Sequence, residues 1–230
     1  YRKMKSRYRI HQIIMGFAIM IMILSAAVSA AFMFRDVPFD KYTSNVTRGQ
    51  SDIVNETTGE KLTSYEAWLQ YSIMSDSFSA RNREGFDSVT IKLSDFNSKR
   101  IEKLDRGYRA SRVLIFVSVI LLVFGFLVVR RRRMYDCVVW GGLAGTVIGI
   151  IFILLVWIGK GDFFGGIKAM AFKHDYSVFF NGDDYLRDIL PDRMGINMFT
   201  AFAVVLIVGF LVTLIVRIVS MRKSEPHRFR

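Results

Sequence analysis

Four long apolar runs alternate with polar segments along this chain. The runs cover residues 13–34, 113–129, 137–158 and 198–220. Each has roughly the 20 residues that a helix needs to cross a hydrocarbon layer about 30 Å thick. In lipid, only a helix satisfies every backbone hydrogen bond within such a run. The pattern therefore predicts an all-α integral membrane protein whose four spans form a transmembrane helix bundle.

The excess of basic residues is confined to three short segments. Residues 1–12, 130–136 and 217–230 hold 14 of the 32 Lys and Arg but only 2 of the 20 Asp and Glu, which accounts for the net charge of +12. The other polar segments, 35–112 and 159–197, are balanced in charge. Because basic loops are retained in the cytoplasm, we expect both chain ends inside and the two balanced segments outside.

This topology predicts a plasma-membrane, multi-pass protein whose functional face is extracytoplasmic. In chain order we expect a basic cytoplasmic N-terminus (1–12), a first span (13–34), a helical extracytoplasmic cap (35–112), a second span (113–129), a basic cytoplasmic loop (130–136), a third span (137–158), an extracytoplasmic interfacial segment (159–197), a fourth span (198–220) and a basic cytoplasmic tail (221–230).

The first apolar run has an alternative interpretation as a cleaved signal peptide. Its basic start and the small residues at 25–31 suit a signal peptide. However, the run continues through Phe34 and is long enough to span a bilayer. We therefore expect an uncleaved first helix.

Composition excludes several classes of function. The single cysteine, Cys137, permits no disulfide framework. Topology and attraction to anionic lipid headgroups explain the basic charge, so it does not indicate nucleic acid. The spans almost lack charged residues, which argues against a transport pathway. The sequence has neither metal-ligand spacing nor a Gly-rich phosphate loop, so we expect no metal and no cofactor.

The cap segment 35–112 is too long for a plain connection and needs structure of its own. Thr63-Ser64-Tyr65-Glu66 matches a helix capping box, and the helix that follows is expected to continue to Met74. A second amphipathic helix is predicted from 86 to about 103. In the first helix, one face is expected to dock on the membrane surface or on the bundle, and it consists of Tyr65, Trp68, Leu69 and Ile73.

Segment 159–197 holds the candidate chemistry, because aromatic rings and acids are interleaved there with one histidine. His174 is the only histidine expected outside, and its ordinary pKa near 6.5 suits a general base. A structural histidine among interfacial aromatic residues is the alternative. Nearby carboxylates can orient the imidazole, and tyrosine or asparagine can donate to an oxyanion. We assign His174, Asp183 and Tyr185 as catalytic, and Asp175, Tyr176, Asn181, Asp184 and Arg193 as substrate-binding.

Three glycines in the third span form a small-residue ridge. Gly141, Gly145 and Gly149 recur every four residues, a spacing that lets another helix approach closely. The partner helix is expected to belong to the same chain or to a second integral membrane protein.

The second outer segment resembles one known family. His174, Phe179-Phe180, Asn181, Asp183, Tyr185 and Leu190-Pro191-Asp192 follow, over about 20 residues, the motif order of the lipoprotein intramolecular transacylase family of Gram-positive membrane proteins. The four-span layout is similar as well. A second register, that is, an alternative alignment of this segment with the family motif, puts Lys168 at the position of the family's histidine. The family also has a histidine in the first outer loop, where this chain has Arg83-Glu84-Gly85-Phe86-Asp87, so the resemblance is to a divergent member.

The resemblance implies an outer-leaflet acyltransferase. Its partners would be membrane lipid and a lipidated protein, because an O-acyl chain of a diacylglyceryl lipoprotein moves to the amine of its N-terminal cysteine and leaves a lyso form. The alternative is a non-enzymatic scaffold or partner subunit that binds another protein through the cap and the Gly141/Gly145/Gly149 face.

Overall fold

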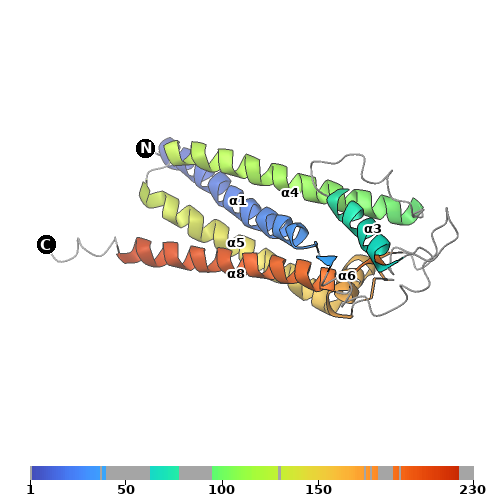
Figure 1. Ribbon diagram of the computed structural model, residues 1–230. Helices are drawn as coiled ribbons and strands as arrows, with labels where there is room; N and C mark the ends of the chain where they lie inside the picture. The colour runs from blue at the N-terminus through green and yellow to red at the C-terminus, as the bar shows by residue number, and fades with distance from the viewer. Residues whose placement is uncertain are drawn as a thin grey trace. The chain divides into compact units, whose positions relative to one another are not determined.

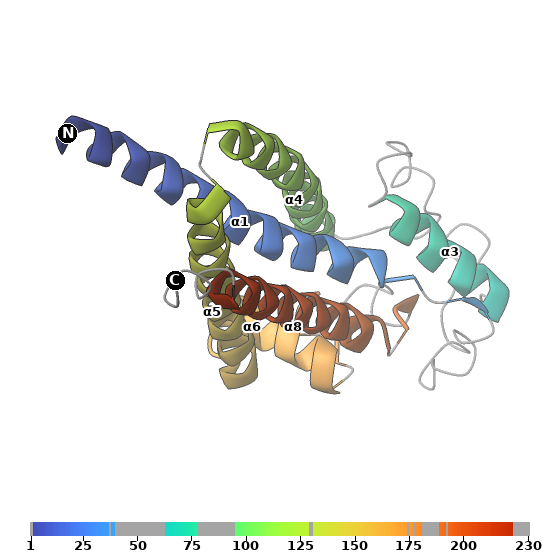
Figure 2. The ribbon, with the colours of Figure 1, turned by 90° about the vertical axis from the view of Figure 1, so that its left-hand side faces the viewer.

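The structure is a computed structural model of the 230-residue chain. It describes residues 2–36, 38–39, 63–77, 95–128, 131–173, 175–176, 178–180, 189–191 and 193–222. Its helices, shown from two directions in Figure 1 and Figure 2, are α1 (Arg2–Met33), α3 (Ser64–Ser77), α4 (Asp95–Val128), α5 (Arg131–Ile158), α6 (Asp162–Lys168), the π-helical turn η2 (Ala169–Lys173) and α8 (Arg193–Arg222).

Four of these helices contain stretches long and apolar enough to cross a membrane. The stretches are Ile10–Met33 in α1, Phe96–Gly125 in α4, Asp136–Ile158 in α5 and Arg193–Val219 in α8. They confirm the predicted fold class, an all-α integral membrane protein with four membrane-spanning helices. The inside–outside orientation and the nine-part division of the chain stay predictions.

The chain forms two compact units. Unit 1 comprises Tyr1–Ser29, Ala110–Ile153 and Phe202–Arg230, and unit 2 comprises Ala30–Arg109 and Leu154–Ala201. All three basic segments belong to unit 1. Unit 2 contains almost all of the two segments that are balanced in charge.

Unit 1 is a helix bundle with apolar side chains on its outside and a few hydroxyl groups inside. Phe116, Phe124 and Leu127 of α4 are each more than 60% exposed, as expected for side chains that face lipid. Two of these hydroxyls form a hydrogen bond: the Ser29 oxygen of α1 lies 2.8 Å from the Ser111 oxygen of α4. This interhelical bond satisfies a polar group that would otherwise be costly in hydrocarbon.

The glycine ridge of α5 lies against other helices of unit 1. A Cβ atom on Gly141 would be 2.2 Å from the carbonyl oxygen of Gly16 on α1, and one on Gly145 would be 3.3 Å from an α1 backbone atom. A Cβ atom on Gly149 would be 2.5 Å from the side chain of Leu206 on α8. The ridge is therefore covered by helices of the same chain.

One sequence expectation differs from the structure. The amphipathic stretch predicted to end near 103 is continuous with the second span, because α4 runs unbroken from Asp95 to Val128. Its buried side continues through Asn97, Ile101, Asp105 and Tyr108 at helical spacing, so packing in unit 2 favours the helix through Gly107. The predicted part at 86–94 lies outside the described residues.

Candidate functional site

The candidate site is a small cavity in unit 2, where the end of α1 meets α3, α4 and the start of α8. Its volume is about 40 Å³. The wall is apolar except at Arg35, Tyr71 and Ser75, and its other lining residues are Phe32, Met74, Ile101, Leu104, Phe180, Leu190, Met194 and Met198. The cavity is therefore an apolar space with one buried cation at its edge.

Helix α3 forms one wall, and a capping box fixes its first turn. The backbone N–H and the hydroxyl of Thr63 both donate to Glu66 Oε2 at 2.7 Å, and the Glu66 N–H donates back to Thr63 Oγ1 at 3.3 Å. These two bonds to the carboxylate lower the pKa of Glu66. The predicted capping box is confirmed, and it satisfies N–H groups that the first turn leaves without helical partners.

The buried face of α3 is not the face on which the sequence analysis focused. The buried residues recur at three- and four-residue spacing and are Ala67, Gln70, Tyr71, Met74 and Ser75. Tyr65 and Leu69, from the stripe expected to dock on the membrane surface or on the bundle, are exposed, so this stripe is not the side that packs within unit 2. Both faces of α3 are apolar enough to pack, so hydropathy alone does not identify the side that enters the protein.

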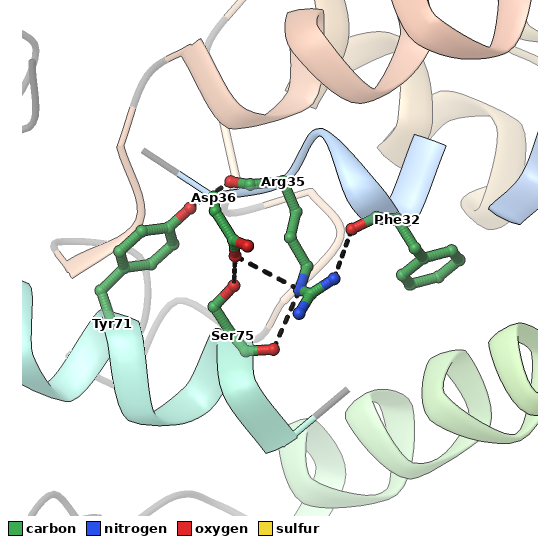
Figure 3. Close-up of polar contacts among 5 residues, drawn as sticks. All are labelled: Phe32, Arg35, Asp36, Tyr71 and Ser75. Carbon is green, nitrogen blue, oxygen red and sulfur yellow. Dashed lines mark hydrogen bonds and ion pairs between the residues drawn. The ribbon is translucent and has the colours of Figure 1, made fainter. Parts of the chain in front are cut away.

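Arg35 joins the end of α1 to α3 and is only 6% exposed. As Figure 3 shows, its Nε donates to the Ser75 carbonyl at 2.9 Å and its Nη1 donates to the Phe32 carbonyl. The Asp36 carboxylate lies 3.5 Å from Nε and also accepts from the Ser75 hydroxyl. In return, the Tyr71 hydroxyl donates to the Arg35 carbonyl.

This position explains how a guanidinium is tolerated inside an apolar wall. Phe32 is in the last turn of α1 and Ser75 is in the last turn of α3, where carbonyls lack helical partners. Arg35 therefore caps the C-termini of two helices, whose dipoles favour a cation. The neighbouring Asp36 side chain is 60% exposed, so its ion pair with Arg35 is screened by solvent and weak.

Tyr176, predicted to bind substrate, has its hydroxyl engaged within the protein. It is buried, donates to the Pro191 carbonyl at 2.7 Å and accepts from the Gly195 N–H at 3.2 Å. Its backbone carbonyl accepts from the N–H groups of Phe179 and Phe180. Tyr176 thus fastens the chain around residues 176–180 to the start of α8.

Arg100 of α4 holds the aromatic pair of the family-like motif. Its Nη1 donates to the Phe179 carbonyl. Its guanidinium stacks over the Phe96 ring at 4.6 Å and over the Phe179 ring at 5.0 Å. Phe179 and Phe180 are both buried, and Phe180 reaches the cavity. The motif's two phenylalanines are therefore part of the cavity wall and its support.

The structure locates only some of the predicted site residues. Asp175 is half-buried next to Tyr176, and Arg193 is exposed at the first residue of α8. His174, Asn181, Asp183, Asp184 and Tyr185 lie outside the described residues, so the catalytic assignments stay predictions. In the ranges that the structure describes, no group of three His, Cys, Asp or Glu side chains is arranged to hold a metal.

Lys168, which the second register aligned with the family's histidine, ends α6. A Cβ atom on Gly159 would lie 2.7 Å from Lys168 Cδ, so the lysine stem packs on the turn that follows α5. Gly159 has φ +68°, a conformation that favours glycine.

The sequence analysis missed Arg35 and Arg100. The sequence did contain an indication for Arg35. The positive-inside rule disfavours a basic residue at the expected outer end of a span, which suggests that Arg35 has a structural or functional role. The role of Arg100 depends on a tertiary contact with Phe179, which lies far from it in sequence, so the local sequence around Arg100 does not reveal it.

Comparison with solved structures identifies proteins of the same fold, whereas comparisons of sequence find no match. No family profile matches the chain, and no curated protein matches it significantly. The membrane integral lipoprotein intramolecular transacylase Lit from Bacillus cereus, in an in meso structure, superposes with a TM-score of 0.68 at 14% identity over 96% of this chain and 98% of that one. A histidine-to-arginine mutant of Lit gives 0.64 at 13% identity, over 97% and 96%. This chain thus shares its fold with the Lit transacylase along nearly its entire length.

Proposed function

We propose that this protein is a membrane acyltransferase that acts on lipoproteins. The reaction would move an O-acyl chain of a diacylglyceryl lipoprotein to the amine of its N-terminal cysteine. The observation that carries the proposal is the fold shared with the Lit transacylase over 96% of the chain. The order of motif residues around Phe179 and Phe180, which line or support the cavity, adds to it.

The chemistry requires one base and one oxyanion donor. The cysteine amine nitrogen attacks the ester carbonyl carbon, a C–N bond forms, and the C–O bond to glycerol breaks. His174 would take the amine proton and return it to the departing glycerol oxygen. Asp183 would orient the imidazole, and Tyr185 would donate to the tetrahedral oxyanion.

Substrate positioning would supply much of the rate enhancement. Holding an amine and an ester together in one substrate is worth about 7–11 kcal/mol through proximity. Asp175, Asn181, Asp184 and Arg193 would contact the polar part of the lipoprotein. The Tyr176 ring would act mainly by fixing the segment that carries them, since its hydroxyl is bonded to Pro191 and Gly195.

The proposed active face is extracytoplasmic. Unit 2 contains the cavity and most of the segments that are balanced in charge, whereas the basic segments belong to unit 1. This division supports the orientation that the positive-inside rule predicts. Diacylglyceryl lipoproteins displayed in the outer leaflet would then reach the cavity side of the protein.

Mass spectrometry of lipoprotein N-termini tests the proposal. Cells that make a diacylglyceryl lipoprotein would be compared with and without this protein, and with the variants His174→Ala and His227→Ala. We expect the lyso form only with the unaltered protein and with His227→Ala, the matched control in the tail. Unchanged N-terminal acylation in all four strains would contradict the proposal.

A further inference from the structure

Helix α3 presents a second apolar face, opposite the face that it buries in unit 2. Tyr65 is 56% and Leu69 39% exposed on that side. A helix that borders water usually carries polar residues on its outer face. An exposed apolar face on a helix that is already packed on its other side calls for an apolar environment.

Aromatic rings cluster at this face. Phe39, itself 39% exposed, has its ring centroid 5.7 Å from Tyr65 and 5.6 Å from Trp68, and the latter two are 5.8 Å apart. We call Phe39, Tyr65, Trp68 and Leu69 the aromatic face. Tyrosine and tryptophan favour the lipid headgroup region because each combines an apolar body with a polar tip.

Chain connectivity holds this face near the end of a membrane span. The span of α1 ends at Met33, and Phe39 follows six residues later, within about 20 Å along an extended chain. Arg35 is only two residues beyond the span and bonds to Ser75 near the other end of α3. Residues 35 and 39 thus tether both ends of α3 to the first residues outside the membrane.

We infer that the aromatic face of α3 inserts into the headgroup region of the bilayer. The inference commits to a lipid surface as the occupant and is independent of the acyltransferase proposal. α3 would then rest on lipid through one face and on the cavity wall through the other, which links the membrane surface to Tyr71 and Ser75.

Tryptophan fluorescence in liposomes tests this inference with the full-length chain. The chain has three tryptophans. In a Trp140→Phe/Trp157→Phe variant, Trp68 is the sole reporter. In a Trp68→Phe/Trp140→Phe variant, Trp157 is the control, because it lies in a membrane-spanning stretch and is 67% exposed. The quenchers are phosphatidylcholines brominated near the glycerol or near the chain ends, and aqueous iodide.

We expect Trp68 to lose most of its emission to bromines near the glycerol, less to bromines near the chain ends and little to iodide. Strong iodide quenching without an effect of brominated lipid would overturn the inference. Absence of quenching by every agent would also overturn it, since protein would then cover the face.

A Tyr65→Ser/Leu69→Ser variant in each single-tryptophan background gives a second measurement. We expect weaker lipid quenching and stronger iodide quenching of Trp68, with the Trp157 signal unchanged. If this variant does not fold, the quenching of Trp68 in the parent still decides the question.

Discussion

A Cβ atom on Gly141 of α5 would lie 2.2 Å from the carbonyl oxygen of Gly16 on α1. The contact is between backbones, so no side-chain rotation can relieve it. A Cβ atom on Gly16 would in turn lie 2.3 Å from the Trp140 ring. The two glycines therefore allow α1 and α5 to approach closely, the arrangement that small residues provide within membranes.

Gly141→Ala should destabilise the protein, because α1 and α5 must separate to admit the methyl group. We expect a loss of about 1–3 kcal/mol, the usual cost of overpacking, measured as a lower thermal unfolding midpoint in detergent. Gly107→Ala is the matched control. Nothing lies within 4 Å of a Cβ at Gly107 in α4, so alanine should be neutral or slightly stabilising there. Equal midpoints for the two variants would contradict the close approach.

The buried hydroxyl of Tyr176 gives a second prediction. Tyr176→Phe leaves the buried Gly195 N–H without this acceptor and the Pro191 carbonyl with the Met194 N–H alone, which should cost about 1–3 kcal/mol. Chemical unfolding in mild detergent, followed by circular dichroism, measures this cost. Tyr65→Phe removes a hydroxyl from an exposed ring and should change stability by less than about 0.5 kcal/mol. A comparable loss in both variants would refute the structural role of Tyr176.

The hydropathy pattern was sufficient to predict the four membrane-spanning helices. The four apolar runs correspond to the four spanning helices, and the Thr63–Glu66 box marks where α3 begins. These features are local, since run length and capping depend on neighbouring residues. The sequence analysis was wrong to end the second cap helix near residue 103, because packing of Asp105 and Tyr108 in unit 2 continues that helix into the second span.

The candidate site was less predictable from sequence. The cavity wall is held in place by hydrogen bonds between residues far apart in the chain, such as Arg35 with Ser75 and Arg100 with Phe179. No periodic pattern relates such residues, because their proximity follows from how the helices pack. The motif analysis did identify the Phe179-Phe180 pair, one ring of which lines the cavity.

Substituting Arg35 should loosen α3 selectively. Arg35→Met removes the donor shared by the Ser75 and Phe32 carbonyls at two helix ends, at a cost of about 1–3 kcal/mol. Hydrogen exchange should become faster in α3 and stay unchanged around Gly141 in α5. Arg35→Lys keeps the charge but not the planar fork, so we expect intermediate protection. Unchanged exchange of α3 in Arg35→Met would show that the guanidinium does not hold this helix.

Arg100 offers a test of how the Phe179-Phe180 motif is positioned. Arg100→Gln loses the stacking on exposed Phe96 and on buried Phe179, contributions of about 0.5–1 and about 2 kcal/mol respectively. If the acyltransferase proposal holds, misplacement of the motif should lower the yield of lyso-form lipoprotein with normal protein levels. Arg106→Gln is the control. It removes the same charge from α4, but the ion pair that Arg106 forms with Glu102 is between two exposed side chains. Equal loss in both variants would indicate a general effect of charge.

Glu66 predicts how the start of α3 responds to pH. Its pKa is lowered in the folded protein, mainly by the Thr63 backbone N–H and then by the Thr63 hydroxyl. A lowered folded pKa means that the carboxylate stabilises the fold fully above its unfolded pKa of 4.5, and that this contribution is lost as the pH falls through the folded value. Hydrogen exchange of the first turn of α3, corrected for intrinsic rates, should therefore show less protection in acid than at neutral pH. Glu66→Gln keeps an acceptor for the cap but does not titrate. It should abolish most of the pH dependence at this turn, and a pH response that persists in the variant would assign the effect to another group.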